Sequence, residues 1–470
     1  MELFKQFYDV SDLYQAVLYF ASCSTNQSQN CLKKVAQMKF RSEEDPVSDI
    51  SKEADSRIAF YDVEVFRNLL LVNWKFRGKS EKCKRMINPS PREVASLFKY
   101  RLIGFNNRRY DNHILYARSQ GYSIDEIYRL SKRIVNADKG VANNYLFANA
   151  YGLSYADVYD YTSAHRQSLK KWEIELHIHH KELGYDWNKP VPEEDWVKVA
   201  EYCDNDVIAT EAVFEATQAE FMARKILAAI SKLSINDTDN QHSAKILFGE
   251  NVNDKTEAYK QEFVYTDLSI EFPGYEFDHG KSSYMGEDPS EGGYAWSKPG
   301  VYYDVWVFDV ASMHPHSAIA LNIFGDRFTK RYKEIVDLRV AIKHGEIEKA
   351  KQMFDGALIP FLQDTTYLKD IAQALKIVIN AVYGNTSAKF NNKFKDVRNV
   401  DNIVAKRGSL FMITLKNALL EKGVEVIHCK TDSIKVPSPS EEIKQFIYDF
   451  GKKYGYDFEV ENVYEKMCII

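Results

Sequence analysis

Two pairs of side chains in the first half of the chain have types and spacings that suit metal binding. Asp62 and Glu64 are two residues apart in YDVEVF, so on a strand both carboxylates leave the same face. Hard divalent cations prefer such carboxylate oxygens when they face outward from a buried strand. Tyr202 and Asp206 are four residues apart in EYCDNDV, which places a phenol beside a carboxylate on one helix face. Taken alone, each pair also fits an ordinary solvent-exposed surface.

Two further acidic residues stand where the sequence predicts the boundary of an element. Asp111 follows an Asn and an aromatic residue in FNNRRYDNHIL, at the predicted start of a helix, where it also suits a helix cap. Asp309 ends the apolar run VWVFDV just before ASMHPHSAIA, where a buried strand gives way to a helix. Backbone amides at such a helix start can cradle phosphate groups.

The elements expected to position the first group are two strands and a long helical segment. IAFYDVEVFRNLLLVNWKF, which begins at Ile58, is rich in β-branched and aromatic residues and predicts two strands of a buried sheet. VPEEDWVKVAEYCDNDVIATEAVFEATQAEFMARKILAAISKL has Pro and acidic residues at its start and predicts the helices that close a first domain. Residues 1–55 look mostly helical and polar and carry no readable chemistry.

A strand, helices and a hairpin are expected in the second half, in that order. The Gly-rich and aromatic segment 262–300 predicts turns and a connector, and VYYDVWVFDV then predicts a strand that opens a second domain. Residues 329–354 and 367–383 predict two helices of an antiparallel pair. VEVIHCKTDSIKV predicts a β-hairpin whose turn lies near Lys430 to Asp432.

The bulk properties describe a multi-domain globular protein. A chain of 470 residues is too long for one hydrophobic core, and its 45% hydrophobic content with 30 Tyr and 27 Phe argues against disorder. Six scattered cysteines without a CxxC pair predict reduced thiols. No apolar run approaches the roughly 20 residues of a membrane span, and the start lacks a signal peptide. We therefore expect no membrane association and a cytoplasmic location, in a host cell if the protein is viral. The net charge of -5 by itself points away from DNA.

The ordered set of DxE on a strand, Asn-x-x-Tyr-Asp, and Tyr-x-x-x-Asp on a helix resembles the DEDDy exonuclease family. The resemblance implies a ribonuclease H-like fold in which two Mg²⁺ ions are held by Asp62, Glu64, Asp111 and Asp206. It also implies that Tyr202 orients the attacking water. A two-metal site generates hydroxide at neutral pH and stabilises the leaving oxygen of a phosphodiester, in agreement with that role. Lys170 in SLKKW would contact the scissile phosphate of DNA, and it also fits a solvated surface lysine.

DVASMHP resembles motif A of family B DNA polymerases, which usually reads Dxx-Ser-Leu-Tyr-Pro. The resemblance makes Asp309 a metal ligand together with the carbonyl of Val310, and it places Ser312 at the incoming nucleotide. His314 replaces the usual tyrosine, which in the family stacks under the incoming sugar and excludes a 2′-hydroxyl. Sugar selectivity is therefore open here, although an imidazole can fill the same space.

LKIVINAVYGNTSA matches motif B of the same family, K-x3-N-x2-Y-G. Lys376, Asn380 and Tyr383 would share one face of a helix that ends at Gly384. The resemblance implies that the lysine pairs with the triphosphate and that the tyrosine and the glycine form the wall of the base-pair pocket, at the DNA. Taken alone, the pattern also fits an amphipathic helix with a glycine cap.

HCKTDSIKV resembles motif C of the family, Y-x-D-T-D-S. The resemblance makes Asp432 the essential metal ligand and places Thr431 at the DNA. Lys430 stands where the family has its first aspartate. An ammonium group beside two cations weakens metal attraction, but that first position is supporting in the family, so we expect activity to be retained.

Two other segments fit the family less closely. Gly292 and Gly293 in SEGGYAW lie where the family has a Tyr-x-Gly-Gly hinge at the DNA, with Ser290 in place of the tyrosine, and a plain turn also explains them. Arg339 and Lys343 are four residues apart in DLRVAIK. They would close on the triphosphate from the other finger helix, or they form a solvated basic face.

The motifs occur in family order from about residue 58 to residue 436, and the resemblance is nearest to enzymes of tailed bacteriophages. The expected fold is multi-domain, α/β and α+β, with a ribonuclease H-like exonuclease followed by a polymerase palm with inserted helical fingers. The expected parts are a lead-in (1–55), the exonuclease (56–225), a connector (226–300), the palm (301–328 and 390–470) and the fingers (329–389). The thumb expected after motif C is absent, because the sequence stops at VYEKMCII. This predicts a fragment or a second polypeptide that supplies the thumb.

The resemblance implies template-directed addition of dNTPs to a primer 3′ end, with proofreading. Two Mg²⁺ ions would act at each site, with Mn²⁺ as a substitute. Primer-template DNA, dNTPs and a second polypeptide or processivity factor would be the partners. Short spacings between the motifs disfavour priming by a terminal protein. Two alternatives stay open: an exonuclease with a degenerate palm, and a non-catalytic DNA-binding subunit of a split replicase.

Overall fold

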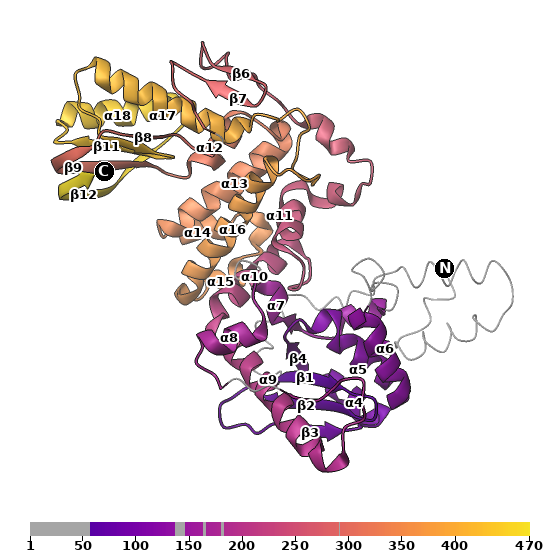
Figure 1. The fold of residues 1–470 in the computed structure, drawn as a ribbon. Helices are drawn as coiled ribbons and strands as arrows, with labels where there is room; N and C mark the ends of the chain where they lie inside the picture. The colour runs from indigo at the N-terminus through magenta and orange to yellow at the C-terminus, as the bar shows by residue number, and fades with distance from the viewer. Residues whose placement is uncertain (1–56, 137–145, 163–165, 180–182, 291) are drawn as a thin grey trace. The chain divides into compact units, whose positions relative to one another are not determined.

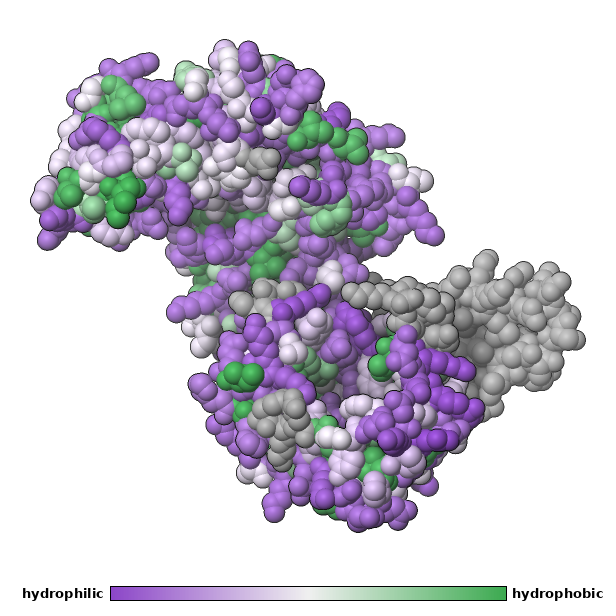
Figure 2. All heavy atoms as spheres, viewed as in Figure 1, coloured by the Kyte–Doolittle hydropathy of each residue, from purple (hydrophilic) through white to green (hydrophobic). Residues whose placement is uncertain are grey.

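The computed structural model describes residues 57–136, 146–162, 166–179, 183–290 and 292–470 (Figure 1). The expected helical lead-in, 1–55, lies outside these residues. Across these ranges the strands form two five-stranded sheets, in which the strands do not follow sequence order, and one short hairpin. Helices pack around them. None of the helices in these ranges is long and apolar enough to cross a membrane. Hydrophilic residues cover most of the face seen in Figure 2, and the hydrophobic patches on it are small and separate.

The first sheet has the strand order β3-β2-β1-β4-β5. Its strands are β1 (Ile58–Val65), β2 (Leu70–Phe76), β3 (Lys84–Ile87), β4 (Arg101–Gly104) and β5 (Ala156–Asp157). β1 pairs with β2 antiparallel and with β4 parallel, which confirms the two strands expected from Ile58 onward. β1 is almost entirely buried, in keeping with its continuous apolar pattern.

Helices cover this sheet. They are α4 (Pro91–Ala95), α5 (Asp111–Ser119), α6 (Ile124–Asn136), α7 (Val158–Tyr161), α8 (Leu169–Glu175) and α9 (Trp196–Ala216). The next helix, α10 (Gln218–Ser231), packs mainly on α16 (Leu368–Thr386) and α11 (Asp239–Phe248). α9 packs on β1 and β2, with Val207 and Phe214 in one buried cluster with Phe60 of β1. The predicted helical conformation of this segment is confirmed, and the segment is divided into α9 and α10 at Thr217.

The second sheet has the order β12-β9-β11-β10-β8, and all its pairs are antiparallel. Its strands are β8 (Ala295–Ser297), β9 (Gly300–Val310), β10 (His428–Lys430), β11 (Ser433–Pro437) and β12 (Phe458–Ile469). The expected strand over VYYDVWVFDV and the expected hairpin are confirmed as β9 and β10–β11. Within the expected turns and connector of 262–300, the structure adds β8 and the hairpin β6 (Glu276–Asp278)–β7 (Lys281–Ser283), which the sequence did not predict. These strands have three residues each, too few for a periodic signal.

The remaining helices are α11 (Asp239–Phe248), α12 (Met313–Ala320), α13 (Gly325–Lys343), α14 (Ile347–Lys351), α15 (Ile359–Leu362), α16 (Leu368–Thr386), α17 (Ile403–Glu421) and α18 (Glu441–Lys453). α13 and α16 are the expected packed pair, and the Tyr332 hydroxyl donates to the Ile379 carbonyl at 3.1 Å. The first helix ends at Lys343, eleven residues before the expected 354, because Gly345 has a φ of +75° that breaks the helix. α16 continues through Gly384, which is therefore not a cap.

The cysteine pattern agrees with its expected chemistry in the described part of the chain. Four cysteines lie there and all are free thiols, namely Cys83, Cys203, Cys429 and Cys468. Cys203 and Cys429 are buried, so they pack as small apolar side chains.

Candidate functional site

Three carboxylates of the described residues are close enough to share a metal ion. Oxygens of Asp62, Glu64 and Asp206 lie within 4.8 Å of one another. The first two leave one face of β1, and Asp206 comes from α9, which packs against that strand. Three carboxylates around one point are a suitable ligand set for Mg²⁺ or Mn²⁺. The structure thus brings these three residues together, and their role as metal ligands stays a prediction.

Asp111 adds a fourth carboxylate to this group. It is the first residue of α5 and is buried, and its carboxylate accepts a hydrogen bond from the backbone of Val63 on β1. Burial raises its pKa to about 7, and the Asp157 and Asp206 carboxylates add to the rise. Tyr202 lies one turn before Asp206, and its pKa is raised by burial and by the Asp206 charge. Its phenol is therefore protonated at neutral pH.

Like charges crowd the acidic group. Burial, followed by the charges of Asp206 and Asp111, holds the pKa values of Asp62 and Glu64 well above their ordinary range. The charge of Lys170 on α8 acts in the opposite direction and lowers the pKa of Glu64. This charge therefore acts on the acidic group although the Lys170 side chain is exposed. A divalent cation bound among these carboxylates would relieve their repulsion.

Cys203 is a member of this site that the sequence did not single out. Its thiol is fully buried and lies 3.4 Å from Asp62 Oδ2, close enough to donate a hydrogen bond to that carboxylate. It follows Tyr202 directly on α9 and lies three residues before Asp206. This helical spacing could have indicated that Cys203 lies close to Asp206.

Without divalent cations, we expect the melting temperature to rise as the pH is lowered from about 7.5 to about 5.5. The folded-state pKa is about 7 for Asp111 and about 6 for Asp157 and Asp309, against an ordinary value of 3.8. At these carboxylates the folded state binds more protons than the unfolded state in this window, so the stability they contribute falls as pH rises. The lowered pKa values of the buried His113 and His242 act in the opposite direction and reduce the net change. Calorimetry in EDTA measures the effect, and Mg²⁺ added at pH 7.5 should recover the lost stability. A melting temperature that rises with pH would contradict the assignment.

The second acidic pair joins the end of strand β9 to the turn between β10 and β11. Asp309 on β9 is opposite Ser433 on β11, and the Val310 amide donates to the Asp432 carbonyl at 2.9 Å. Burial raises the pKa of Asp309 to about 6, and the next largest cause is the charge of Asp432. Glu461 and Glu459, two acidic residues of β12 that the sequence did not flag, raise it further. The structure thus places the two expected polymerase carboxylates side by side.

The turn that carries Asp432 is held by a close backbone approach. Thr431 has a left-handed φ of 54°, which is unusual for a β-branched residue, and its amide donates to the Tyr294 carbonyl at 2.7 Å. A Cβ at Gly293 would come within 2.9 Å of the Thr431 side chain. Glycine is therefore required at Gly293 for contact with the turn, whereas Gly292 is exposed with nothing near its missing Cβ.

Two lysines flank this pair. Lys430, the last residue of β10, is exposed beside the turn. Lys435 on β11 is half-buried, and its charge lowers the pKa of Asp309, against the larger opposing effects of burial and the nearby acids. The sequence did not indicate Lys435, because its proximity to Asp309 arises from the pairing of β11 with β9.

Residues of the motif A and motif B segments touch. His314 of α12 lies against Tyr383 of α16, with ring centroids 4.3 Å apart at 32°. Burial lowers the pKa of His314, so the imidazole is neutral at pH 7. Ser312 precedes α12 with a left-handed φ of 56°. The structure thus brings a neutral imidazole against the residue predicted to wall the base-pair pocket.

Basic groups lie along α16 and α13. Lys376 and Asn380 are exposed on α16, two turns and one turn before Gly384, which is also exposed. Arg339 of α13 is half-buried, and its Nε is buried without a hydrogen-bond partner among the described residues. Burial lowers its pKa, and Lys343 follows one turn later, exposed. A buried guanidinium nitrogen without a partner suits an anionic ligand.

Comparison with known proteins points to DNA polymerases. No protein-family profile matches the chain. A stretch of 204 residues is 26% identical to DNA polymerase 2 of Aeropyrum pernix, covering 38% of this chain and 25% of that protein. The structure is similar to the family B DNA polymerase of the hyperthermophilic archaeon Pyrobaculum calidifontis, with a TM-score of 0.45 and 16% identity over 88% of this chain and 57% of that one. The chain thus matches only a quarter of the length of the Aeropyrum enzyme. The sequence similarity relates part of the chain to an archaeal DNA polymerase.

Proposed function

We propose that the chain is a template-directed DNA polymerase with a 3′→5′ proofreading exonuclease. Primer-template DNA and dNTPs are the substrates, and Mg²⁺, for which Mn²⁺ can substitute, is the metal at both sites. The observation that carries the proposal is the presence of two separate acidic sites in one chain. One is the group around Asp62 and Asp206, and the other is the pair formed by Asp309 and Asp432.

In the proposed exonuclease, residues 56–225 form a ribonuclease H-like domain. Asp62, Glu64, Asp111 and Asp206 hold the metal ions, which lower the pKa of a bound water and stabilise the leaving 3′ oxygen. The Tyr202 phenol, protonated and next to Asp206, orients that water by hydrogen bonding. Lys170, whose charge acts on Glu64, contacts the scissile phosphate.

In the proposed polymerase, residues 301–328 and 390–470 form the palm and residues 329–389 the fingers. Asp309, the Val310 carbonyl and Asp432 hold the metal ions. The buried and partnerless Nε of Arg339 and the exposed ammonium of Lys376 neutralise the triphosphate. The contact between His314 and Tyr383 forms the floor under the incoming sugar and base. The short spacings between the motifs disfavour priming by a terminal protein.

A second candidate function is an exonuclease whose polymerase site is impaired. Lys430 and Lys435 both lie near Asp309 and Asp432, and a positive charge there opposes metal binding. The two functions are separated by incubating the wild-type chain with a primer-template that ends in a mismatch. With dNTPs and Mg²⁺, a polymerase with proofreading removes the mismatch and extends the primer. An impaired polymerase site gives shortening alone, and a DNA-binding subunit gives neither reaction.

Lys430→Asp is expected to lower the Mg²⁺ concentration that gives half-maximal primer extension. Unit charges 4 Å apart interact by about 1 kcal/mol in water, which is about fivefold in affinity. Because the substitution replaces a positive charge with a negative one, the requirement should fall by about fivefold or more. Steady-state extension over a range of Mg²⁺ concentrations measures it. Lys422→Asp, an exposed change at the end of α17, is the control for total charge. An increased Mg²⁺ requirement for Lys430→Asp would contradict the predicted metal site.

A further inference from the structure

We propose that Asp157, a buried residue outside both acidic sites, is a positioning residue for Asp111. Its carboxylate fixes the loop that leads into α5 and thereby sets the place of the Asp111 carboxylate. The inference rests on the proposed exonuclease site, to which Asp111 belongs. No motif in the sequence singles out Asp157, which lies in YADVYDY, 46 residues after Asp111.

The loop between β4 and α5 has little regular structure of its own. Only six residues separate Gly104, the end of β4, from Asp111, the start of α5. Asn106 has a left-handed φ of 56°, and Tyr110 lies at φ -141° and ψ -75°, outside the helical region. No side chain caps the start of α5. The conformation that presents Asp111 must therefore be stabilised by groups from elsewhere in the fold.

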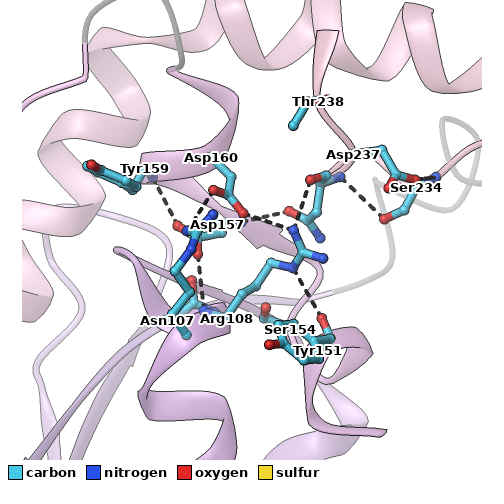
Figure 3. Close-up of polar contacts among 12 residues, drawn as sticks. Asn107, Arg108, Tyr151, Ser154, Asp157, Tyr159, Asp160, Ser234, Asp237 and Thr238 are labelled. Atoms are coloured by element: carbon cyan, nitrogen blue, oxygen red, sulfur yellow. Dashed lines mark hydrogen bonds and ion pairs between the residues drawn. The ribbon is translucent and has the colours of Figure 1, made fainter. Parts of the chain in front are cut away.

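Asp157 supplies that support through both of its carboxylate oxygens (Figure 3). Oδ1 accepts from the amides of Asn106 at 2.8 Å and Tyr159 at 3.0 Å, and Oδ2 accepts from the amide of Arg108 at 3.1 Å. Asp157 is 0% exposed, so these amides have no competing water. A carboxylate can accept all three bonds, because it has acceptor sites on both oxygens and no donor.

Asp157 is itself held in place. Its amide donates to Asn236 Oδ1 at 2.9 Å, and Asn236 Nδ2 donates to the Tyr155 carbonyl at 3.2 Å. The position of the carboxylate is thus fixed by β5 and by the segment that joins α10 to α11 (Figure 3). A fixed acceptor can impose its geometry on the loop, whereas a mobile one would follow it.

Arg108 anchors the same loop by a second, separable set of contacts. Its guanidinium donates to Asp160 Oδ2 at 2.8 Å, to the Asn236 carbonyl at 2.9 Å and to the Tyr151 carbonyl at 3.3 Å. Asp160 also pairs with Arg109 at 2.8 Å. The contacts of Arg108 and Arg109 hold side chains of the loop, whereas Asp157 binds the backbone amides of the loop. Asp160 is therefore a matched control: a buried acid three residues away that touches the same loop without binding its amides.

The test compares Asp157→Asn with Asp160→Asn in metal binding and exonuclease activity. In Asp157→Asn an NH₂ group faces one or more amide N–H groups, so the loop must shift and Asp111 with it. Loss of groups that orient metal ligands costs about 10- to 100-fold in metal affinity or activity. We expect the Mg²⁺ concentration for half-maximal degradation of single-stranded DNA to rise about tenfold or more. In Asp160→Asn we expect a lower melting temperature and a Mg²⁺ requirement within about twofold of the wild type.

Calorimetric titration with Mn²⁺ gives a second readout that needs no turnover. The Mn²⁺ affinity of Asp157→Asn should fall as its Mg²⁺ requirement rises. Both are measured well below the melting temperature of the variant, where essentially all of the protein is folded and unfolding does not lower the apparent affinity. If Asp157→Asn does not fold, Asp157→Glu, which keeps the charge and moves the oxygens by one methylene, replaces it. An Asp157 variant with wild-type metal affinity overturns the inference. A wild-type chain that binds Mn²⁺ but degrades no DNA overturns the proposed function instead, and the titration still decides the role of Asp157.

Discussion

Asp309→Asn is expected to reduce primer extension by more than about a hundredfold and to leave degradation of single-stranded DNA unchanged. Loss of a group that merely orients a metal ligand lowers metal affinity or activity about 10- to 100-fold, so loss of a direct ligand should lower activity further. Asp309 is half-buried on β9 beside Asp432, and the substitution keeps its shape while removing the negative charge. The neighbouring Asp432 would then be left to hold the cations without its partner. Single-turnover extension of a matched primer with one dNTP measures the chemical step directly.

The matched control for this prediction lies on the same strand. Asp304 is exposed on β9, five residues before Asp309, and within the described part of the chain its side chain accepts one hydrogen bond, from the indole of Trp306 at 3.2 Å. Asp304→Asn should therefore extend primers at the wild-type rate. The stability of Asp309→Asn without metal should rise near neutral pH, because its raised pKa of about 6 shows that the charge is unfavourable in the fold. Wild-type extension by a folded Asp309→Asn would rule out the polymerase assignment.

The double variant Asp62→Ala, Glu64→Ala is expected to lose 3′-end degradation by more than about a hundredfold while primer extension continues. Both carboxylates leave one face of β1 toward Asp206, and their removal takes away two of the three acids that lie within 4.8 Å of one another. Asp206 and Asp111, the two acids that remain, cannot hold a metal ion with comparable affinity. The measurement is shortening of a 5′-labelled single strand in Mg²⁺ without dNTPs.

The same double variant has an expected effect on stability that separates loss of a site from loss of fold. The pKa values of Asp62 and Glu64 are raised by burial and by neighbouring acids, so in EDTA at pH 7.5 the variant should melt at a higher temperature than the wild type. Glu201→Ala, which removes an exposed charge on α9, should change neither nuclease activity nor melting appreciably. Unchanged 3′-end degradation in the double variant would rule out this site as the exonuclease.

Local patterns in the sequence were sufficient for several elements. The β-branched and aromatic run from Ile58 predicted β1 and β2, and the helical period predicted α9, α13 and α16. The proximity of Asp62 to Glu64 follows from the two-residue repeat of a strand, and that of Tyr202 to Asp206 from the turn of a helix. These features depend on neighbours within a few residues, which the sequence contains directly.

Contacts between distant segments required the tertiary structure. The sequence could not place β8 beside β10, Lys435 near Asp309, or His314 against Tyr383, because each contact joins residues from separate elements. Gly293 illustrates the difference. The sequence was compatible with a plain turn at Gly293. The fold shows that a Cβ at this position would collide with Thr431, 138 residues later.

The sequence by itself determined which residue types are available for metal chemistry and on which local faces they lie. Tertiary structure alone decided that β1, α5 and α9 bring Asp62, Glu64, Asp111 and Asp206 together, and that Asp157 holds the loop before Asp111. The physical reason is that a carboxylate acquires its function from its surroundings. Burial and neighbouring charges raise its pKa, and backbone amides fix its position, and both depend on segments that meet only when the chain has folded.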